Sequence, residues 1–217
     1  MQIIFITGIE TEFDKKLASA FSYGNCKVFA MGEKWIEGVT LLPLNLTEAY
    51  FTLSKCAGHI DIYIDVNDKR CENDIFNVRK GISDDIMRKT YEENVIKPMT
   101  TLEVFLPLLE AGNGKRLCFL TSTEASINET RCTEGYGYNM AKAALHNFLQ
   151  ITKNVLMPRG YTFRVFDPMY SQAPPEMAAQ AAFNYFVRRR GIERGDKRRD
   201  DEDNLVFRDA FGRQHTW

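Results

Sequence analysis

The chain alternates short apolar runs with longer stretches whose apolar residues recur at helical spacing. The short runs are rich in Ile, Val, Phe and Leu, and such runs predict strands that are buried on both faces. These predicted strands cover 2–6, 27–30, 39–42, 60–66, 116–121, 162–166 and 205–208. The amphipathic stretches between them predict helices over 12–21, 47–56, 84–109, 138–156 and 175–190.

The alternation predicts an α/β fold: a Rossmann-like, doubly wound sheet of seven mostly parallel strands flanked by helices. No repeat or Ser/Gly-rich linker divides the 217 residues, so we expect a single domain over 1–217, whose last residues close the sheet edge. Segment 188–203 departs from the pattern, because seven basic side chains precede a run of acids. We expect a solvated, mobile loop there, and a phosphate- or partner-binding patch is the alternative.

Composition narrows the class of protein. Apolar residues make up 44% of the chain, enough to bury a core, and 28 basic residues against 29 acidic ones give no positive field. We therefore expect no nucleic-acid or membrane partner. The start, MQIIFITGIETEF, lacks the basic residues of a signal peptide and the length of a membrane span. Five cysteines without a CxxC pair and three dispersed histidines predict free thiols, no metal site and a cytoplasmic location.

Candidate chemistry begins at Tyr138 and Lys142, which share one face of a predicted helix because they are four residues apart. A lysine cation lowers the pKa of a neighbouring phenol from about 10, so such a tyrosine can exchange a proton near neutral pH. The spacing alone is weak, since it recurs at Tyr23 and Lys27. An ordinary surface pair is the structural alternative.

Two further polar residues precede this pair in the chain. Ser122 directly follows the predicted strand 116–121, at the carboxyl end where open α/β sheets place their sites, and its hydroxyl could donate to a substrate oxygen. Asn94 lies on the long predicted helix that would pack beside the helix of Tyr138. A cap for Ser122 and a solvated position for Asn94 are the alternatives.

This ordered set, with Thr7-Gly8 after the first strand and Pro168 after the sixth, resembles the short-chain dehydrogenase/reductase (SDR) family over roughly residues 1–210. The resemblance implies an oxidoreductase that interconverts a carbonyl and an alcohol of a small-molecule substrate with NAD or NADP. It implies that the catalytic residues are Asn94, Ser122, Tyr138 and Lys142, and that the cofactor-binding residues are Thr7, Gly8, Asn45, Lys142 and Pro168.

The family also implies a role for each catalytic residue. Ser122 would orient the substrate oxygen, and Tyr138 would act as the acid or base. Lys142 would lower the pKa of the tyrosine and hold the nicotinamide ribose. Asn94 would anchor a water molecule that links the lysine to solvent for proton relay.

The motifs that bind the cofactor in the family are only partly kept in this sequence. The family's first turn reads TGxxxGxG, and here Glu12 and Asp14 replace the second and third glycines. Carboxylates there add bulk and negative charge where pyrophosphate approaches a helix N-terminus, so we expect weak or absent dinucleotide binding. The family's Asn-Asn-Ala-Gly stretch after the fourth strand is replaced here by Asp-Val-Asn-Asp at 65–68, and its Pro-Gly after the sixth strand is replaced by Pro168-Met169. The alternative function is an SDR-fold protein that does not bind NAD(P), either a cofactor-free acid–base enzyme or a non-catalytic binding or regulatory scaffold.

The helices over 84–109 and 138–156 carry apolar side chains beyond one stripe, which predicts cover from a second copy. The residues concerned are Val95, Met99, Leu102, Phe105, Leu145, Phe148 and Leu149. Because the family commonly pairs these two helices across a two-fold axis, we expect a homodimer or homotetramer.

Overall fold

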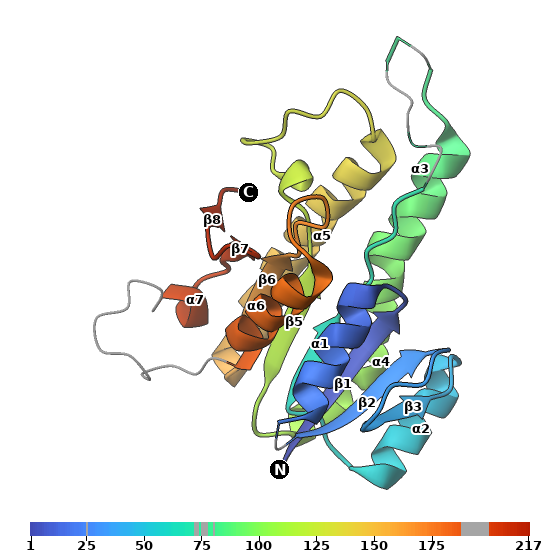
Figure 1. Cartoon of the computed structure of the whole chain (residues 1–217), viewed down its shortest axis with the longest axis vertical. Helices are drawn as coiled ribbons and strands as arrows, with labels where there is room; N and C mark the ends of the chain where they lie inside the picture. Colours follow the sequence, from blue (N-terminus) through green and yellow to red (C-terminus); the bar gives the residue numbers. More distant parts are fainter. Residues whose placement is uncertain (25, 72–73, 75–77, 80, 188–199) are drawn as a thin grey trace.

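A computed structural model describes residues 1–24, 26–71, 74, 78–79, 81–187 and 200–217. Within them, eight strands form one sheet in the order β3-β2-β1-β4-β5-β6-β7-β8 (Figure 1). Neighbouring strands are parallel except β7 and β8. The strands are β1 (Gln2–Ile9), β2 (Cys26–Gly32), β3 (Val39–Leu42), β4 (Ile62–Asp65), β5 (Arg116–Leu120), β6 (Thr162–Asp167), β7 (Phe207–Asp209) and β8 (Gln214–His215).

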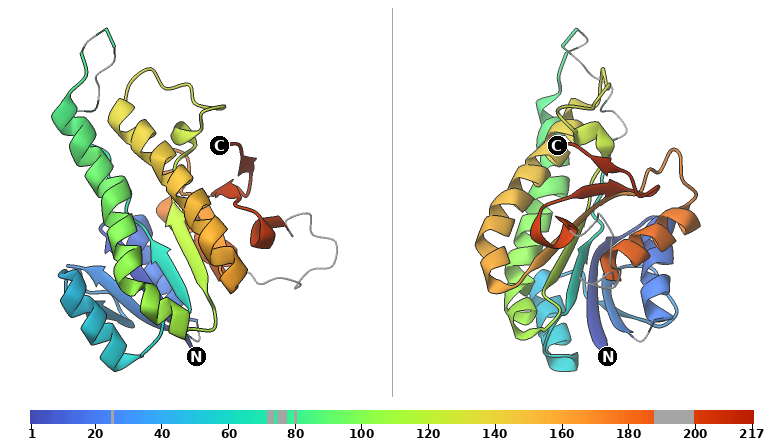
Figure 2. Two further views of the ribbon diagram at one scale, coloured as in Figure 1. Left: turned by 180° about the vertical axis from the view of Figure 1, so that it is seen from behind. Right: turned by 90° about the vertical axis from the view of Figure 1, so that its left-hand side faces the viewer.

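Helices cover both faces of this sheet. The α-helices are α1 (Glu12–Ser22), α2 (Leu46–Cys56), α3 (Asp84–Tyr91), α4 (Lys97–Ala111), α5 (Tyr136–Leu156), α6 (Pro175–Val187) and α7 (Asp200–Asp203). A π-helical turn, η1 (Glu92–Ile96), joins α3 to α4, and the 3-10 turns are η2 (Thr123–Ala125) and η3 (Met157–Arg159). Helices α1 and α6 lie together on one face, and α4 and α5 lie on the other (Figure 2).

The alternation of side chains along β1 explains this arrangement. Ile4 and Ile6 point to the face of α1 and α6, whereas Ile3 and Phe5 point to the face of α4 and α5. Phe105 of α4 is fully buried against Phe5, with ring centroids 4.2 Å apart. Truncating such an aromatic side chain to alanine typically costs about 3–5 kcal/mol. The apolar runs therefore form strands that are buried on both faces, as the pattern predicts.

The predicted fold class is confirmed, with two differences in detail. The sheet gains a two-residue eighth strand, β8, which pairs antiparallel to β7 and closes the edge. The predicted helix over 84–109 is interrupted by η1, which no periodicity signals. Of the charged segment 188–203, residues 188–199 lie outside the described residues, and the last four form the short helix α7 instead of loop.

Two further findings bear on the class of protein. All five cysteines are free thiols. Throughout the described ranges, no helix combines the length and the apolar character that crossing a bilayer requires.

Candidate active site

The carboxyl ends of the central strands form the candidate site. The strand order reverses between β1 and β4, and open α/β sheets bind ligands at such a point. A cavity of about 720 Å³ opens here, with Gly8 and Asn67 on one side and Gly32, Glu33 and Leu44 on the other. Structure and sequence pattern thus place the ligand groove at the same edge.

Tyr138 and Lys142 lie side by side on α5, and both side chains are buried. The Tyr138 hydroxyl donates to Asp68 Oδ1 at 2.6 Å, and Lys142 Nζ lies 3.0 Å from the same oxygen. Lys142 Nζ also donates to the Asn67 carbonyl at 2.9 Å. The two side chains therefore converge on a single oxygen atom, which belongs to the loop after β4.

Asp68 is the residue that sequence reasoning missed. The available signal was an acid at the end of the stretch 65–68, where the SDR family has glycine. Burial of the phenol raises the pKa of Tyr138 well above 10, the Asp68 carboxylate raises it further, and the nearby Arg70 cation acts in the opposite direction. The net shift is opposite to the lowering that the sequence predicts, and the charge of Lys142 is paired with Asp68 beside the phenol.

Asn94 lies in η1 and is completely buried, so the alternative of a solvated position is wrong. Its amide nitrogen donates to the Lys69 carbonyl at 2.7 Å and to the Thr90 carbonyl at 2.9 Å, and its oxygen accepts from Lys69 N at 3.0 Å. Asn94 thus fixes the backbone one residue beyond Asp68. Single π-turns inside helices occur frequently at functional sites.

Ser122 is buried at the end of β5 and caps η2, where its Oγ accepts from Glu124 N at 3.2 Å. Because this bond uses the oxygen only as an acceptor, the hydroxyl proton stays available for donation. The neighbouring Asp167 accepts from Thr123 N at 2.6 Å and from Met169 N at 2.7 Å, and so joins the ends of β5 and β6.

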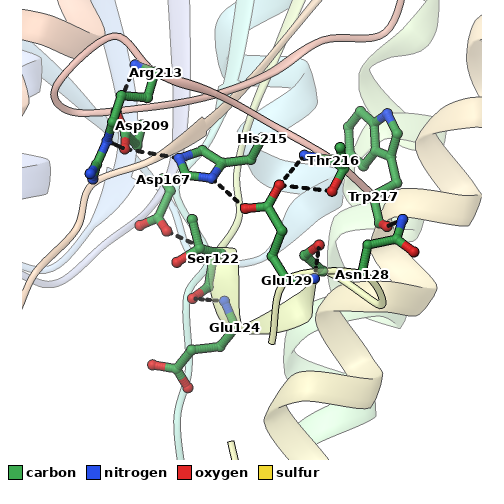
Figure 3. A network of polar contacts seen from close by, with 12 residues as sticks. Ser122, Glu124, Asn128, Glu129, Asp167, Asp209, Arg213, His215, Thr216 and Trp217 are labelled. Carbon is green, nitrogen blue, oxygen red and sulfur yellow. Dashed lines mark hydrogen bonds and ion pairs between the residues drawn. The ribbon is translucent and has the colours of Figure 1, made fainter. Parts of the chain in front are cut away.

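A second polar network holds the segment that follows Ser122 (Figure 3). His215 of β8 lies between Glu129 and Asp209, with Nδ1 2.8 Å from Glu129 Oε2 and Nε2 2.9 Å from Asp209 Oδ2. Thr216 donates twice to Glu129, and these bonds, together with His215, lower the pKa of that carboxyl to about 2. Hydrogen bonds to the two carboxylates outweigh burial and raise the pKa of His215. The chain end is therefore fastened to the loop beside Ser122.

The degraded glycine turn is a capping box at the start of α1. Asp14 Oδ2 accepts from Glu10 N at 3.0 Å and from Thr11 N at 2.7 Å, while Asp14 N donates to Thr11 Oγ at 3.2 Å. Burial raises the pKa of Asp14 to about 6. Glu12 instead points outward and pairs with Lys15. Of the two acids, only Asp14 covers backbone amides that could meet a phosphate.

The remaining predicted cofactor residues lie around the groove. A Cβ on Gly8, whose φ is 70°, would come within 2.4 Å of Asn67 Oδ1, so only glycine fits. Thr7 Oγ accepts from Asn67 Nδ2 at 3.3 Å. Asn45 is exposed and caps α2 by accepting from Glu48 N at 3.1 Å. The cavity wall there includes its neighbours, Leu44 and Leu46.

Pro168 is buried directly after β6, and Met169 behind it has a φ of 54°, a conformation that favours glycine. Met169 therefore takes, without being glycine, the backbone conformation that glycine favours. At the start of α1, the Asp14 carboxylate occupies the backbone amides. In the described part of the chain, no group of three or more His, Cys, Asp or Glu side chains could hold a metal ion.

The comparisons define the fold: the chain has the fold of solved short-chain dehydrogenase/reductase structures, and the predicted resemblance is confirmed at the level of the fold. NADPH-bound carbonyl reductase from chicken fatty liver matches with a TM-score of 0.77 and 13% identity over 100% of both chains. Carbonyl reductase Sniffer of D. melanogaster matches with a TM-score of 0.78 and 16% identity, again over 100% of both chains. These low identities mark a divergent chain.

Sequence comparison gives a match to part of an oxidoreductase. An uncharacterized oxidoreductase of Schizosaccharomyces pombe is 27% identical over 114 residues, which is 52% of this chain and 44% of that protein. The match thus spans less than half the length of this curated relative. No family model matches the chain.

Proposed function

We propose that the protein is an oxidoreductase of the SDR type that interconverts a carbonyl and an alcohol of a small molecule, with Tyr138 as its acid–base group. The observation that carries the proposal is the convergence of Tyr138 Oη and Lys142 Nζ on one oxygen atom, at 2.6 and 3.0 Å. A substrate oxygen at that point would receive the phenol proton directly. General acid catalysis requires such hydrogen-bond reach.

The side chains divide the work on a substrate oxygen. In the reducing direction, Tyr138 gives its proton to the carbonyl oxygen, and the Lys142 ammonium stabilises the negative charge that develops there. Ser122 orients that oxygen with its hydroxyl proton, which the cap of η2 does not use. Asn94 keeps the loop after β4 in place through its bonds to Lys69. A bound nicotinamide would supply the hydride.

We propose that this nicotinamide cofactor, NAD or NADP, binds weakly. Thr7, Gly8, Lys142 and Pro168 would line its path, and the neighbouring NADPH-bound carbonyl reductase supports the assignment of the groove. Binding requires Asp14 to leave the amides of Glu10 and Thr11, so two hydrogen bonds of the capping box must break. The free energy that this costs is subtracted from the cofactor's affinity.

A second candidate is an SDR-fold protein that does not bind NAD(P), either a cofactor-free acid–base enzyme or a binding scaffold. The specific observation in its favour is again Asp14, whose carboxylate lies where a phosphate group would meet backbone N–H groups. In this candidate the Tyr138–Lys142 pair binds or protonates a ligand oxygen without hydride transfer.

Titration of the purified protein with NADH and NADPH separates the two candidates. Nicotinamide fluorescence and the melting temperature report binding, and a panel of aldehydes and ketones reports turnover. Saturable binding with turnover supports the oxidoreductase. No binding at millimolar concentrations of either cofactor contradicts it and favours the second candidate.

A further inference from the structure

Asp68 is a buried carboxylate inside the candidate site, at a position where the SDR family has glycine. Its side chain is 6% exposed, and Asn94 fixes the backbone next to it through Lys69. The backbone of this loop is held as well, because the Asn67 carbonyl accepts from Lys142 Nζ at 2.9 Å, so only the Asp68 side chain would turn away from Tyr138 and Lys142. Asp68 therefore belongs to the architecture of the site.

The hydrogen bond to Tyr138 constrains what the phenol can do. A phenol has one proton to donate, and here that proton is directed to Asp68 Oδ1 at 2.6 Å. A substrate oxygen can accept the same proton only by replacing this carboxylate oxygen. Lys142 is engaged by the same atom, so the substrate oxygen and Asp68 compete for both partners.

We propose that Asp68 is a positioning residue that occupies the oxygen-binding point of Tyr138 and Lys142 and keeps the proton on the phenol. The proposal rests on the proposed function, in which this point receives the substrate oxygen. It deepens that function by assigning a preferred direction. A phenol that keeps its proton is prepared to donate to a carbonyl oxygen and is a poor base for deprotonating an alcohol.

The proton balance of the favoured direction is simple. The Tyr138 O–H bond breaks, a new O–H bond forms on the substrate oxygen, and the carbonyl carbon receives a hydride from a reduced nicotinamide. The alcohol product leaves, and the phenolate recovers a proton from solvent. Asp68 then returns to Tyr138 and Lys142.

Other charged groups around Tyr138 also affect the equilibrium between its phenol and its phenolate. The Arg70 guanidinium lies over the ring, 4.0 Å from its centroid, and favours the phenolate, whereas Asp167 at the end of β6 disfavours it. Asp74 accepts from Tyr138 N at 2.8 Å. One turn after Lys142 on α5 lies His146, whose pKa is lowered to about 3 by burial and by that lysine. Among these groups, Asp68 is the carboxylate that accepts the hydrogen bond of the hydroxyl itself, at 2.6 Å.

A titration of tyrosine ionisation tests the proposal without substrate or cofactor. The ultraviolet absorbance of tyrosinate is followed against pH in the parent protein and in Asp68→Asn, each with and without Tyr138→Phe. Subtracting the Tyr138→Phe curve isolates one tyrosine out of nine. We expect no Tyr138 ionisation in the folded parent, and in Asp68→Asn an ionisation at lower pH, because the carboxylate that disfavours the phenolate is gone while Lys142 and Arg70 remain.

Matched variants complete the experiment. Asp68→Gly, the residue of the family pattern, should shift the titration in the same direction, and it serves if Asp68→Asn folds poorly. Glu10→Gln removes a carboxylate that is paired with Lys69 and should leave the Tyr138 titration unchanged. Identical Tyr138 titrations in the parent and both Asp68 variants would overturn the proposal. Because this readout needs no turnover, it stays decisive even if the protein proves not to be an oxidoreductase.

Discussion

Lys142 and Asp68 form an ion pair that is closed to solvent, with side-chain exposures of 0% and 6%. Removing one partner of such a pair leaves an uncompensated buried charge, which typically costs about 3–5 kcal/mol. We therefore expect Lys142→Ala to lower the free energy of unfolding by about that amount. Combining Lys142→Met with Asp68→Asn should recover much of the loss.

Urea unfolding of Lys142→Met, Asp68→Asn and the double variant measures this coupling. Additive effects in the double variant would show that the two side chains do not interact. The same variants connect stability to function, since losing the lysine also removes the cation that would stabilise charge on a substrate oxygen.

A second prediction at the scale of a residue concerns His215 and the dependence of folding stability on pH. Its folded-state pKa is raised by its bonds to Asp209 and Glu129. A raised pKa stabilises the fold fully at pH values below the unfolded histidine pKa, and this contribution is lost as pH rises through the folded pKa. The stability difference between the parent and His215→Ala should therefore shrink as pH rises from acidic through neutral values.

Thermal unfolding across this pH range, with His59→Ala as a matched control, checks the effect. A difference that stays constant with pH, or grows as pH rises, would contradict the assignment. His215 contacts Glu129, which lies 86 positions earlier in the chain, in the loop that follows Ser122. Loss of the histidine should therefore also loosen this loop.

Among the elements, helix α1 matters most for the proposed cofactor affinity, because a phosphate group would bind at its N-terminus. Asp14 lies on the amides of Glu10 and Thr11, whereas Glu12 points to solvent beside Lys15. We expect Asp14→Gly to increase NAD(P)H affinity and Glu12→Gln to leave it unchanged, because only Asp14 competes with a phosphate. Asp14→Gly also removes the Asp14 half of the capping box and places a glycine in the first turn of α1, so we expect it to lower the free energy of unfolding.

Calorimetric titration of the parent and both variants gives the answer, with the melting temperature of each measured in parallel. Equal gains from both substitutions would mean that general charge, and not the occupied amides, limits binding. Tight binding by the parent would contradict the role given to Asp14.

The elements also show what the sequence could predict. The central strands were predictable because both of their faces are buried, which leaves uninterrupted apolar runs. The pairing of Tyr138 with Lys142 followed from helical spacing. The family pattern marks Asp68 as an acid in place of glycine, but its contact with Tyr138 and Lys142 was not predictable, because loop 66–71 has no periodicity that reports where a side chain points. The π-turn at Asn94 and the contact of His215 with Glu129 depend on tertiary packing, which local patterns do not encode.

At the scale of the whole molecule, the homodimer or homotetramer stays a prediction, but it now depends on other side chains than those the sequence suggested. Five of the seven apolar side chains that suggested it are buried within the chain. Helix α5 nevertheless exposes Ile151 and Val155, at 59% and 58%. We expect an oligomer in sedimentation at micromolar concentration, and its dissociation by Ile151→Glu combined with Val155→Glu.

A folded monomer for the parent protein would contradict this prediction. Circular dichroism of the double variant controls for unfolding, since both side chains point away from the core and their replacement should leave the helix intact.

Turnover of the parent protein against Tyr138→Phe is the most direct test of the central claim, that Tyr138 is the acid–base group of an oxidoreductase. The assay follows NADH or NADPH consumption with a panel of aldehydes and ketones, and the melting temperature shows that the phenylalanine ring still packs. We predict turnover by the parent and a loss of about 10²–10⁴-fold in Tyr138→Phe, the range of general acid–base catalysis. Equal turnover by the two proteins would contradict the account.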